Sequence, residues 1–116
     1  MNNTLVYLAV PYSHPDPSVK ERRFQTVNKV AGILMQRGLH IFSPISHTHP
    51  IAICHSLPEG WEFWKDYDEA VLRHCCKVLV LMLDGWKDSE GVNAEINAAL
   101  DLGLPVEYLD PEEFEC

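Results

Sequence analysis

The sequence predicts an α/β fold: a doubly wound, mostly parallel sheet of four to five strands with helices on both faces, of the flavodoxin-like or Rossmann-like kind. Short apolar runs alternate along the chain with longer segments in which apolar residues recur every three or four positions. The 116 residues, 47% of them hydrophobic, suit one domain with a single core. Because parallel neighbours need crossover connections, this alternation favours helices packed on both faces of one sheet.

The first half of the chain is expected to contain a strand, a helix, a second strand and a loop. Residues 4–10 are an apolar, β-branched run that ends at Pro11, which cannot donate to a sheet. Apolar residues recur at helical spacing over residues 17–36, which predicts a helix. A short strand is expected over residues 39–43. The segment 44–60 is rich in Pro, Ser and His and has no clear period, so we expect a loop there.

The second half continues the alternation. The expected elements are a helix over 61–76, a buried strand over 77–83, a helix over 90–102, a last strand over 105–109 and an acidic tail over 110–116. In folds of this class, ligands bind outside the carboxyl ends of the strands. We therefore expect binding residues in three places: Tyr12 and Ser13, then Ser43 and Pro44, then residues 84–89.

Composition and charge narrow the choice of partners. The net charge is −8 and the nine Lys and Arg residues are scattered, so the chain is not expected to bind long nucleic acid. No segment approaches the roughly 20 apolar residues of a membrane span, and the first residues do not resemble a signal peptide. We expect a cytoplasmic protein with a small-molecule ligand.

Four cysteines without CxxC spacing are expected to be reduced thiols: Cys54, Cys75, Cys76 and Cys116.

Two acidic residues stand on apolar helix faces. Asp68 interrupts the stripe formed by Trp61, Trp64 and Leu72, whereas the other acids of that helix lie on a solvated face. Glu95 shares a face with apolar residues, and no Lys or Arg stands three or four positions away. A buried carboxyl usually responds with a raised pKa.

These two carboxyl groups suggest a division of labour. Glu95 is expected near the amino terminus of its helix, where free N–H groups favour an anion. Asp68 would then hold a proton while Glu95 is ionised. Glycoside chemistry needs one acid to protonate the leaving group and one carboxylate to attack or stabilise the sugar. The alternative is that either residue lies partly exposed at the edge of a helix face.

Three stretches of the chain resemble the nucleoside 2-deoxyribosyltransferases and their 2′-deoxynucleoside 5′-monophosphate N-hydrolase relatives. They are VYLAVPY over residues 6–12, Asp68 eight residues before an apolar strand, and DSEGVNAE over residues 88–95. The resemblance spans nearly the whole chain and implies a single domain of this type over residues 1–116. It also implies no cofactor and a homo-oligomer, a dimer or tetramer.

The resemblance assigns roles to residues at matching positions. Glu95 matches the nucleophile, Asp68 the acid and base that serves the departing base, and Tyr7 the tyrosine near the nucleophile. The implied reaction is cleavage of the N-glycosidic bond of a 2′-deoxynucleoside or its 5′-monophosphate through a covalent glutamyl-sugar intermediate, ending in hydrolysis or base transfer. The expected substrate-binding residues are Tyr12, Ser13, Ser43, Pro44, His47, His49, Trp64, Trp86, Ser89, Gly91 and Asn93.

One position of the resemblance favours a 5′-monophosphate substrate, and two departures from the family pattern weaken that preference. Ser89 stands six residues before Glu95, where the nucleotide hydrolases have a Ser that helps to hold phosphate. Val10 replaces a common Gly, however, and the Gly- and Arg-rich loop of those hydrolases is missing. Phosphate would then be held by Ser13, Ser89 and backbone N–H groups, with charge from His47 or His49.

Two other functions fit parts of the sequence. A nucleotide sensor would bind in the same crevice without cleaving its ligand. A metal site on His47 and His49, which would share one side of an extended loop with Cys54 and His55 beyond, is the weaker alternative, because this spacing matches no zinc signature.

Overall fold

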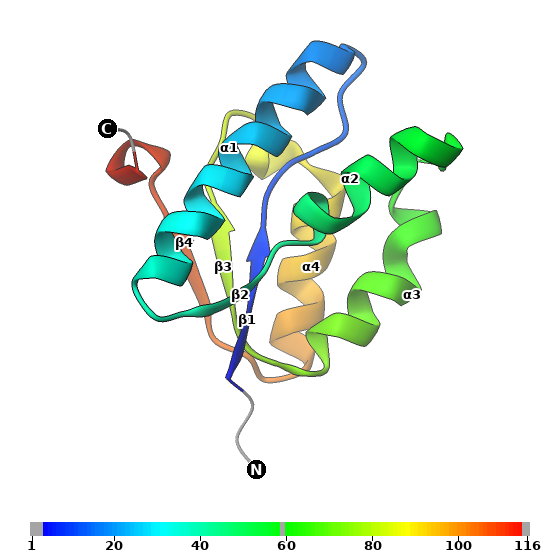
Figure 1. Cartoon of the computed structure of the whole chain (residues 1–116). Coiled ribbons are helices and arrows are strands. Elements are labelled where there is room, and N and C mark those ends of the chain that lie inside the picture. The colour runs from blue at the N-terminus through cyan, green and yellow to red at the C-terminus, as the bar shows by residue number, and fades with distance from the viewer. Residues whose placement is uncertain (1–3, 59, 115–116) are drawn as a thin grey trace.

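The computed structural model describes residues 4–58 and 60–114, and it contains one sheet of four parallel strands. The strands are β1 (Leu5–Ala9), β2 (His40–Phe42), β3 (Cys75–Leu81) and β4 (Val106–Leu109), in the spatial order β2-β1-β3-β4. β1 and β3 are therefore the central strands (Figure 1). The prediction of a parallel, doubly wound sheet is confirmed.

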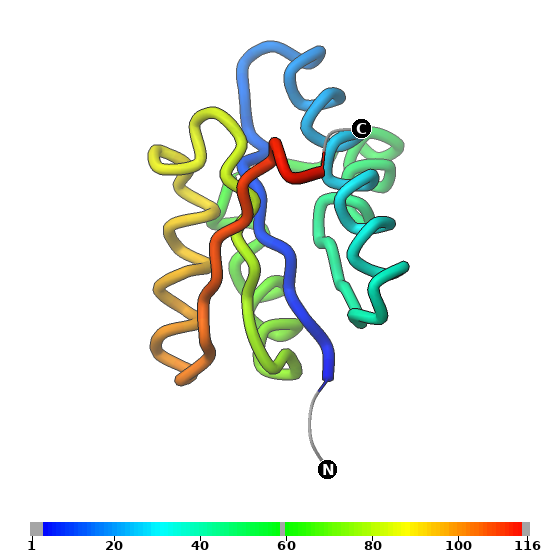
Figure 2. The backbone as a smooth tube through the Cα atoms, turned by 90° about the vertical axis from the view of Figure 1, so that its left-hand side faces the viewer, coloured from blue at the N-terminus to red at the C-terminus, as the bar shows by residue number. Residues whose placement is uncertain are grey.

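The two faces of the sheet are covered by different helices. The helix α1 (Pro17–Gln36) packs on one face, where Val27, Val30 and Leu34 meet Leu8 and other residues of the core. The helices α3 (Trp61–Leu72) and α4 (Glu90–Asp101) pack on the other face. Figure 2 shows α4 and α1 on opposite sides of the sheet. Alternate residues of β1 thus face different layers, because successive side chains of a strand point in opposite directions.

Local signals account for the bounds of α1, which are those expected from the sequence. Asp16 caps the helix by accepting a hydrogen bond from the Ser18 backbone N–H at 2.9 Å, and Pro17 occupies the first helical position. The chain leaves the helix through Gly38, whose φ of +92° lies in the left-handed region that glycine tolerates.

The expectation of a loop over residues 44–60 is wrong, because α2 (Pro44–His55) occupies most of that segment. Ser43 caps this helix, and Pro44 takes the first position, where a missing N–H costs nothing. The buried residues of α2 are Pro44, Thr48 and His49. Thr48 and His49 follow Pro44 by four and five positions, so the three lie toward the same side of the helix. Two of the three are polar, so an apolar period could not reveal the helix.

The second boundary error concerns the adjacent cysteines. The helix expected to reach residue 76 ends at Leu72, and Cys75 and Cys76 begin β3. Cys75 lies opposite Leu5, and a shift of register then places Lys77 opposite Val6. Pairing with the central strand β1 therefore overrides the local continuation of the helix. Cys54, Cys75 and Cys76 are free cysteines, whereas Cys116 lies outside the described residues.

The carboxyl-terminal segment is more than an acidic tail. Residues Pro111–Phe114 form a short 3-10 helix, and Phe114 is buried in the core that α1 shares with the sheet. The Arg37 guanidinium lies 5.3 Å from the centre of the Phe114 ring.

Among the described helices, none combines the length and the apolar character that crossing a membrane requires.

Replacing Phe114 with alanine should therefore destabilise the fold by about 3 kcal/mol, because it empties a well-filled core position. Urea unfolding followed by circular dichroism measures this change. The exposed neighbour Glu113, replaced with alanine, should alter the free energy of unfolding by less than about 0.5 kcal/mol. Equal stability of the two variants would show that the carboxyl-terminal segment does not belong to the core.

Candidate active site

A cavity of about 440 Å³ opens at the carboxyl ends of the two central strands. In doubly wound sheets this is the point where consecutive connections run in opposite directions and where ligands bind. Its walls come from the end of β1, from α2, from α3 and from the start of α4. The polar and aromatic residues that line it are Tyr12, Ser13, Thr48, His49, Trp61, Trp64, Asp68, Asp88, Ser89, Glu90 and Glu95.

Glu95 and Tyr7 meet at the buried side of this cavity. Glu95 projects from α4 with 6% of its surface exposed, and Tyr7, on β1, is fully buried. The Tyr7 hydroxyl donates a hydrogen bond to Oε2 of Glu95. Burial, with the nearby Glu95 carboxyl, raises the pKa of Tyr7 well above its ordinary value, so the phenol keeps its proton. Tyr7 is therefore a permanent donor that orients the Glu95 carboxyl.

Asp68 brings a second carboxyl into the same cavity from α3. It is 8% exposed and lies on the buried face of the helix with Leu72. Within the described part of the chain, no side chain or backbone group forms a hydrogen bond with its carboxyl. Burial alone raises the pKa of Asp68 to about 7. A carboxyl of this kind can hold a proton near neutral pH and release it to a bound ligand.

Glu95 lies outside the first turn of its helix, contrary to expectation, and its pKa is raised as that of Asp68 is. Burial and the neighbouring Asp68 raise the pKa of Glu95 to about 8, although the Tyr7 hydrogen bond lowers it. The amino terminus of α4 does not offset this rise in pKa, because the helix begins at Glu90, five residues before Glu95. Glu95 is the sixth helical residue, beyond the first turn whose free N–H groups favour an anion.

The start of α4 forms another part of the cavity wall. Ser89 caps the helix, and its hydroxyl oxygen accepts a hydrogen bond from the Val92 backbone N–H at 3.2 Å. The hydroxyl proton of Ser89 is not used by that cap. The acidic side chains of Asp88 and Glu90 flank this position, and no Lys or Arg is among the described residues that line the cavity.

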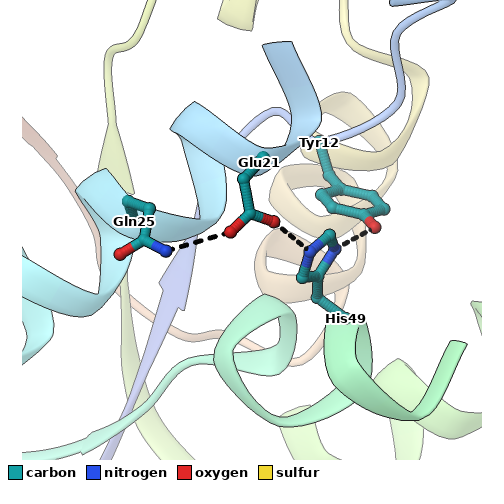
Figure 3. Close-up of polar contacts among 4 residues, drawn as sticks. All are labelled: Tyr12, Glu21, Gln25 and His49. Carbon is teal, nitrogen blue, oxygen red and sulfur yellow. Dashed lines mark hydrogen bonds and ion pairs between the residues drawn. The ribbon is translucent and has the colours of Figure 1, made fainter. Parts of the chain in front are cut away.

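Tyr12 and His49 form the opposite part of the polar lining. The Tyr12 hydroxyl contacts Nδ1 of His49, and Nε2 of His49 lies 2.9 Å from Oε2 of Glu21 on α1 (Figure 3). Glu21 was not anticipated from the sequence, because a glutamate on an exposed helix face carries no local signal. The aromatic part of the lining comes from α3, where Trp64 is held by its Nε1–H donating to the Pro58 carbonyl at 2.8 Å.

Most of the expected site residues converge on this cavity, and five do not line it, among them Tyr7, which contacts Glu95 behind the lining. Tyr12, Ser13, Pro44, His49, Trp64, Asp68, Ser89, Gly91 and Glu95 all line it. Ser43 is occupied in capping α2, and the Asn93 side chain donates to the Lys87 carbonyl. Trp86 packs against Tyr108, with ring centres 5.5 Å apart. His47 borders a separate apolar hollow with Ile51, Phe63 and Tyr67.

His47 and His49 of α2 point in different directions, contrary to the expectation that they share one side of an extended loop. On a helix, residues two positions apart are separated by about 200° around the axis. His49 therefore faces α1 and the cavity, whereas His47 faces α3. Among the described residues, no group of three His, Cys, Asp or Glu side chains is placed to hold a metal ion.

The buried acids should make the fold less stable at alkaline pH. The pKa values of Asp68 and Glu95 rise from ordinary values of 3.8 and 4.5 to about 7 and about 8 on folding. The folded chain therefore holds protons that the unfolded chain has released, so the free energy of unfolding should fall from about pH 4 to about pH 8. Urea titrations across this range measure the fall.

Glu95→Gln should remove much of that dependence. We expect the variant to exceed the wild type in stability by on the order of 3 kcal/mol at pH 8, and to match it at pH 4. Glu62→Gln, at an exposed position of α3, serves as the matched control. If both variants showed the same dependence of stability on pH as the wild type, folding would not raise the pKa of Glu95.

Comparison with known proteins places the chain in a family. The family model described as "Domain of unknown function (DUF1937)" matches residues 4–110, a range that includes every residue of the site from Tyr7 to Glu95. No curated protein matches the chain. Because the match covers nearly all of the sequence, this chain belongs to the DUF1937 family.

Proposed function

We propose that this protein cleaves the N-glycosidic bond of a 2′-deoxynucleoside or its 5′-monophosphate. The observation that carries the proposal is the pair of buried carboxyl groups, Asp68 and Glu95, in one cavity, with Tyr7 orienting the second. Glycosidic bonds are broken by pairs of carboxyl groups, one of which gives a proton while the other meets the sugar carbon. The resemblance to the deoxyribosyltransferases supports the same reaction and the same two residues.

In the proposed mechanism, Glu95 is the nucleophile. Its carboxylate attacks C1′ of the deoxyribosyl group, and the bond between C1′ and the base breaks with its electron pair moving to the base. Asp68 gives its proton to the departing base. Water or a second base, deprotonated or activated by Asp68, then attacks C1′ and releases Glu95. Tyr7 stays protonated throughout and holds Glu95 in position.

The charges around the cavity favour a substrate without a phosphate group. Asp88 and Glu90 are negative at the start of α4, and the described lining contains no Lys or Arg. A 5′-phosphate would meet the free N–H groups and the Ser89 hydroxyl there, but also these two carboxylates. His49, the one described imidazole of the lining, is already hydrogen-bonded to Glu21. We therefore favour a 2′-deoxynucleoside over its monophosphate.

Glu95→Gln should lower the rate of base release at least about a thousandfold, because an amide cannot form the sugar ester. The assay incubates the protein with 2′-deoxynucleosides and their 5′-monophosphates, with and without a free acceptor base, and separates the products. Base release alone indicates a hydrolase, and new nucleosides indicate a transferase. Intact-protein mass spectrometry should find a deoxyribosyl adduct on the wild type and none on Glu95→Gln.

Glu62→Gln, with its exposed side chain, should keep full activity. Normal turnover by Glu95→Gln would contradict the mechanism. Binding of a deoxynucleoside without cleavage under any of these conditions would favour the alternative of a sensor.

The rate of cleavage should first rise and then fall as the pH increases. The carboxyl pair titrates with apparent pKa values of about 7 and about 8. Because the two groups interact, these values belong to the pair, and the productive form is the singly protonated one in which the proton lies on Asp68; kcat/KM should therefore rise to a maximum between the two values and fall on either side. A profile measured from pH 5 to pH 10 checks this, and Asp68→Asn should lose the alkaline limb. A flat profile over that range would exclude these two groups as acid and nucleophile.

A further inference from the structure

Arg23 joins the two loops that follow the central strands of the sheet. The loop over residues 10–16 follows β1 and the loop over residues 82–89 follows β3, at the same edge of the sheet (Figure 1). Arg23, in the second turn of α1, donates from Nη1 to the Ser13 carbonyl at 3.2 Å and from Nη2 to the Asp84 carbonyl at 3.0 Å. One guanidinium therefore bridges two loops that are far apart in the sequence.

The chemistry of this bridge suits an arginine beside a glycine. The guanidinium is planar and always charged, with its donors in a fixed fork, so two of its nitrogens can serve two carbonyls at once. Arg23 is partly buried, and hydrogen bonds from a charged group are stronger where water is excluded. Gly85 has a φ of +89°, and a Cβ there would lie 3.3 Å from Nη2 of Arg23. The lack of a side chain at Gly85 lets the second loop approach the guanidinium closely.

Both loops supply side chains to the cavity. Ser13 lines it from the first loop, and Asp88 and Ser89 line it from the second. The second loop leads directly into α4, which carries Glu95, and Ser89 caps that helix. Arg23 itself is not among the residues that line the cavity. Its bridge therefore acts on the spacing between two walls and not on a ligand directly.

The part of a nucleoside that these loops would meet follows from the other walls. Asp68 and Trp64 both lie on α3, so that wall takes the base that Asp68 protonates. The deoxyribose is left to the remaining walls, where Ser13 and Ser89 contribute hydroxyls. Attack on C1′ needs the sugar in line with the Glu95 carboxylate, and a misplacement of about 1 Å can cost about a hundredfold in rate. The spacing of the two loops thus belongs to the geometry of the reaction.

We propose that Arg23 is a positioning residue: by joining the two loops it fixes the spacing of Ser13 and Ser89, and so holds the deoxyribose against Glu95. The inference rests on the proposed function. Loops that are joined before the ligand arrives need not be ordered by it, which favours binding. Without the bridge, the sugar is bound more weakly and held less accurately, so both KM and kcat change.

The kinetics of Arg23→Ala test this role. The variant should lower kcat about tenfold and kcat/KM about a hundredfold. Arg22→Ala, which removes an exposed arginine from the same helix, should keep wild-type kinetics. Phe114→Ala destabilises the core without touching the cavity lining, and should keep the wild-type kcat at temperatures where circular dichroism shows it folded. An unchanged kcat in Arg23→Ala, or an equal loss in Phe114→Ala, would overturn the proposal.

Arg23→Lys is a milder change that tests the same bridge if Arg23→Ala does not fold. The ammonium keeps the charge but has no planar fork to reach both carbonyls, so kcat/KM should still fall at least about tenfold. Full activity in Arg23→Lys would show that charge alone is needed, which would overturn the bridging role.

Chemical rescue of Arg23→Ala tests the fork itself. Added methylguanidinium can occupy the space of the missing side chain and donate to both carbonyls. It should raise kcat/KM about tenfold, as restored hydrogen bonds from a charged group would. Methylammonium, which has the charge without the fork, should give no gain, and neither compound should accelerate the wild type or Arg22→Ala. Equal rescue by both compounds, or rescue by neither, would overturn the proposal.

Amide hydrogen exchange reads out the bridge without ligand or turnover. Mass spectrometry of Arg23→Ala should show faster exchange in both loops, over residues 10–16 and 82–89, whereas Arg22→Ala should match the wild type. Unchanged exchange in either loop would overturn the proposal. The two proposals fail separately: faster exchange in Arg23→Ala, with no base released by the wild type, refutes the reaction and leaves the bridge, and equal cleavage by the wild type and Arg23→Ala refutes the positioning role alone.

Discussion

The chemistry of this cavity depends on the burial of two carboxyl groups on neighbouring helices. Asp68 on α3 and Glu95 on α4 are both less than a tenth exposed, and water therefore contributes little to stabilising their charges. Removal of water raises their pKa values toward neutrality, where a carboxyl can exchange its proton within a reaction. The fold tolerates this arrangement because the Tyr7 hydroxyl supplies a hydrogen bond to Glu95 and because Asp68 borders the cavity. Stability and reactivity thus place opposite demands on the same two side chains.

The topology of the sheet brings these groups together. β1 is a central strand, and its alternate residues divide between the two layers: Leu8 faces the core beside α1, and Tyr7 faces the layer of α3 and α4. Tyr12 follows five residues after Tyr7, beyond the carboxyl end of the strand, and meets α2 there. A single segment therefore supplies both the donor that holds Glu95 and a wall of the cavity. The crossover connections of a parallel sheet place α2 and α4 on either side of this point.

The walls of the cavity differ in chemical character. α3 contributes tryptophan rings beside Asp68, whereas β1, α2 and the start of α4 contribute hydroxyls and an imidazole. Recognition in such a site relies on directed hydrogen bonds and flat apolar contact more than on charge, because the described lining contains no Lys or Arg. Sites of this kind discriminate strongly against ligands that lack a required donor, since a buried acceptor would be left without a partner. His49 also connects this lining to α1, outside the cavity, through its contact with Glu21.

By itself, the sequence determined the fold class, the bounds of α1 and the two unusual acids, because each depends on local periodicity: a carboxyl on an apolar stripe is visible in the spacing of its neighbours. Tertiary structure decided what periodicity does not encode. The buried face of α2 consists of Pro44, Thr48 and His49, which no apolar pattern reveals, and pairing with β1 drew Cys75 into a strand. The pairing of Glu21 with His49 and the raised pKa values of both carboxyl groups likewise arise from packing between distant segments. Burial is a property of the packed molecule. The pKa values and the contacts of buried residues therefore do not follow from the sequence pattern alone.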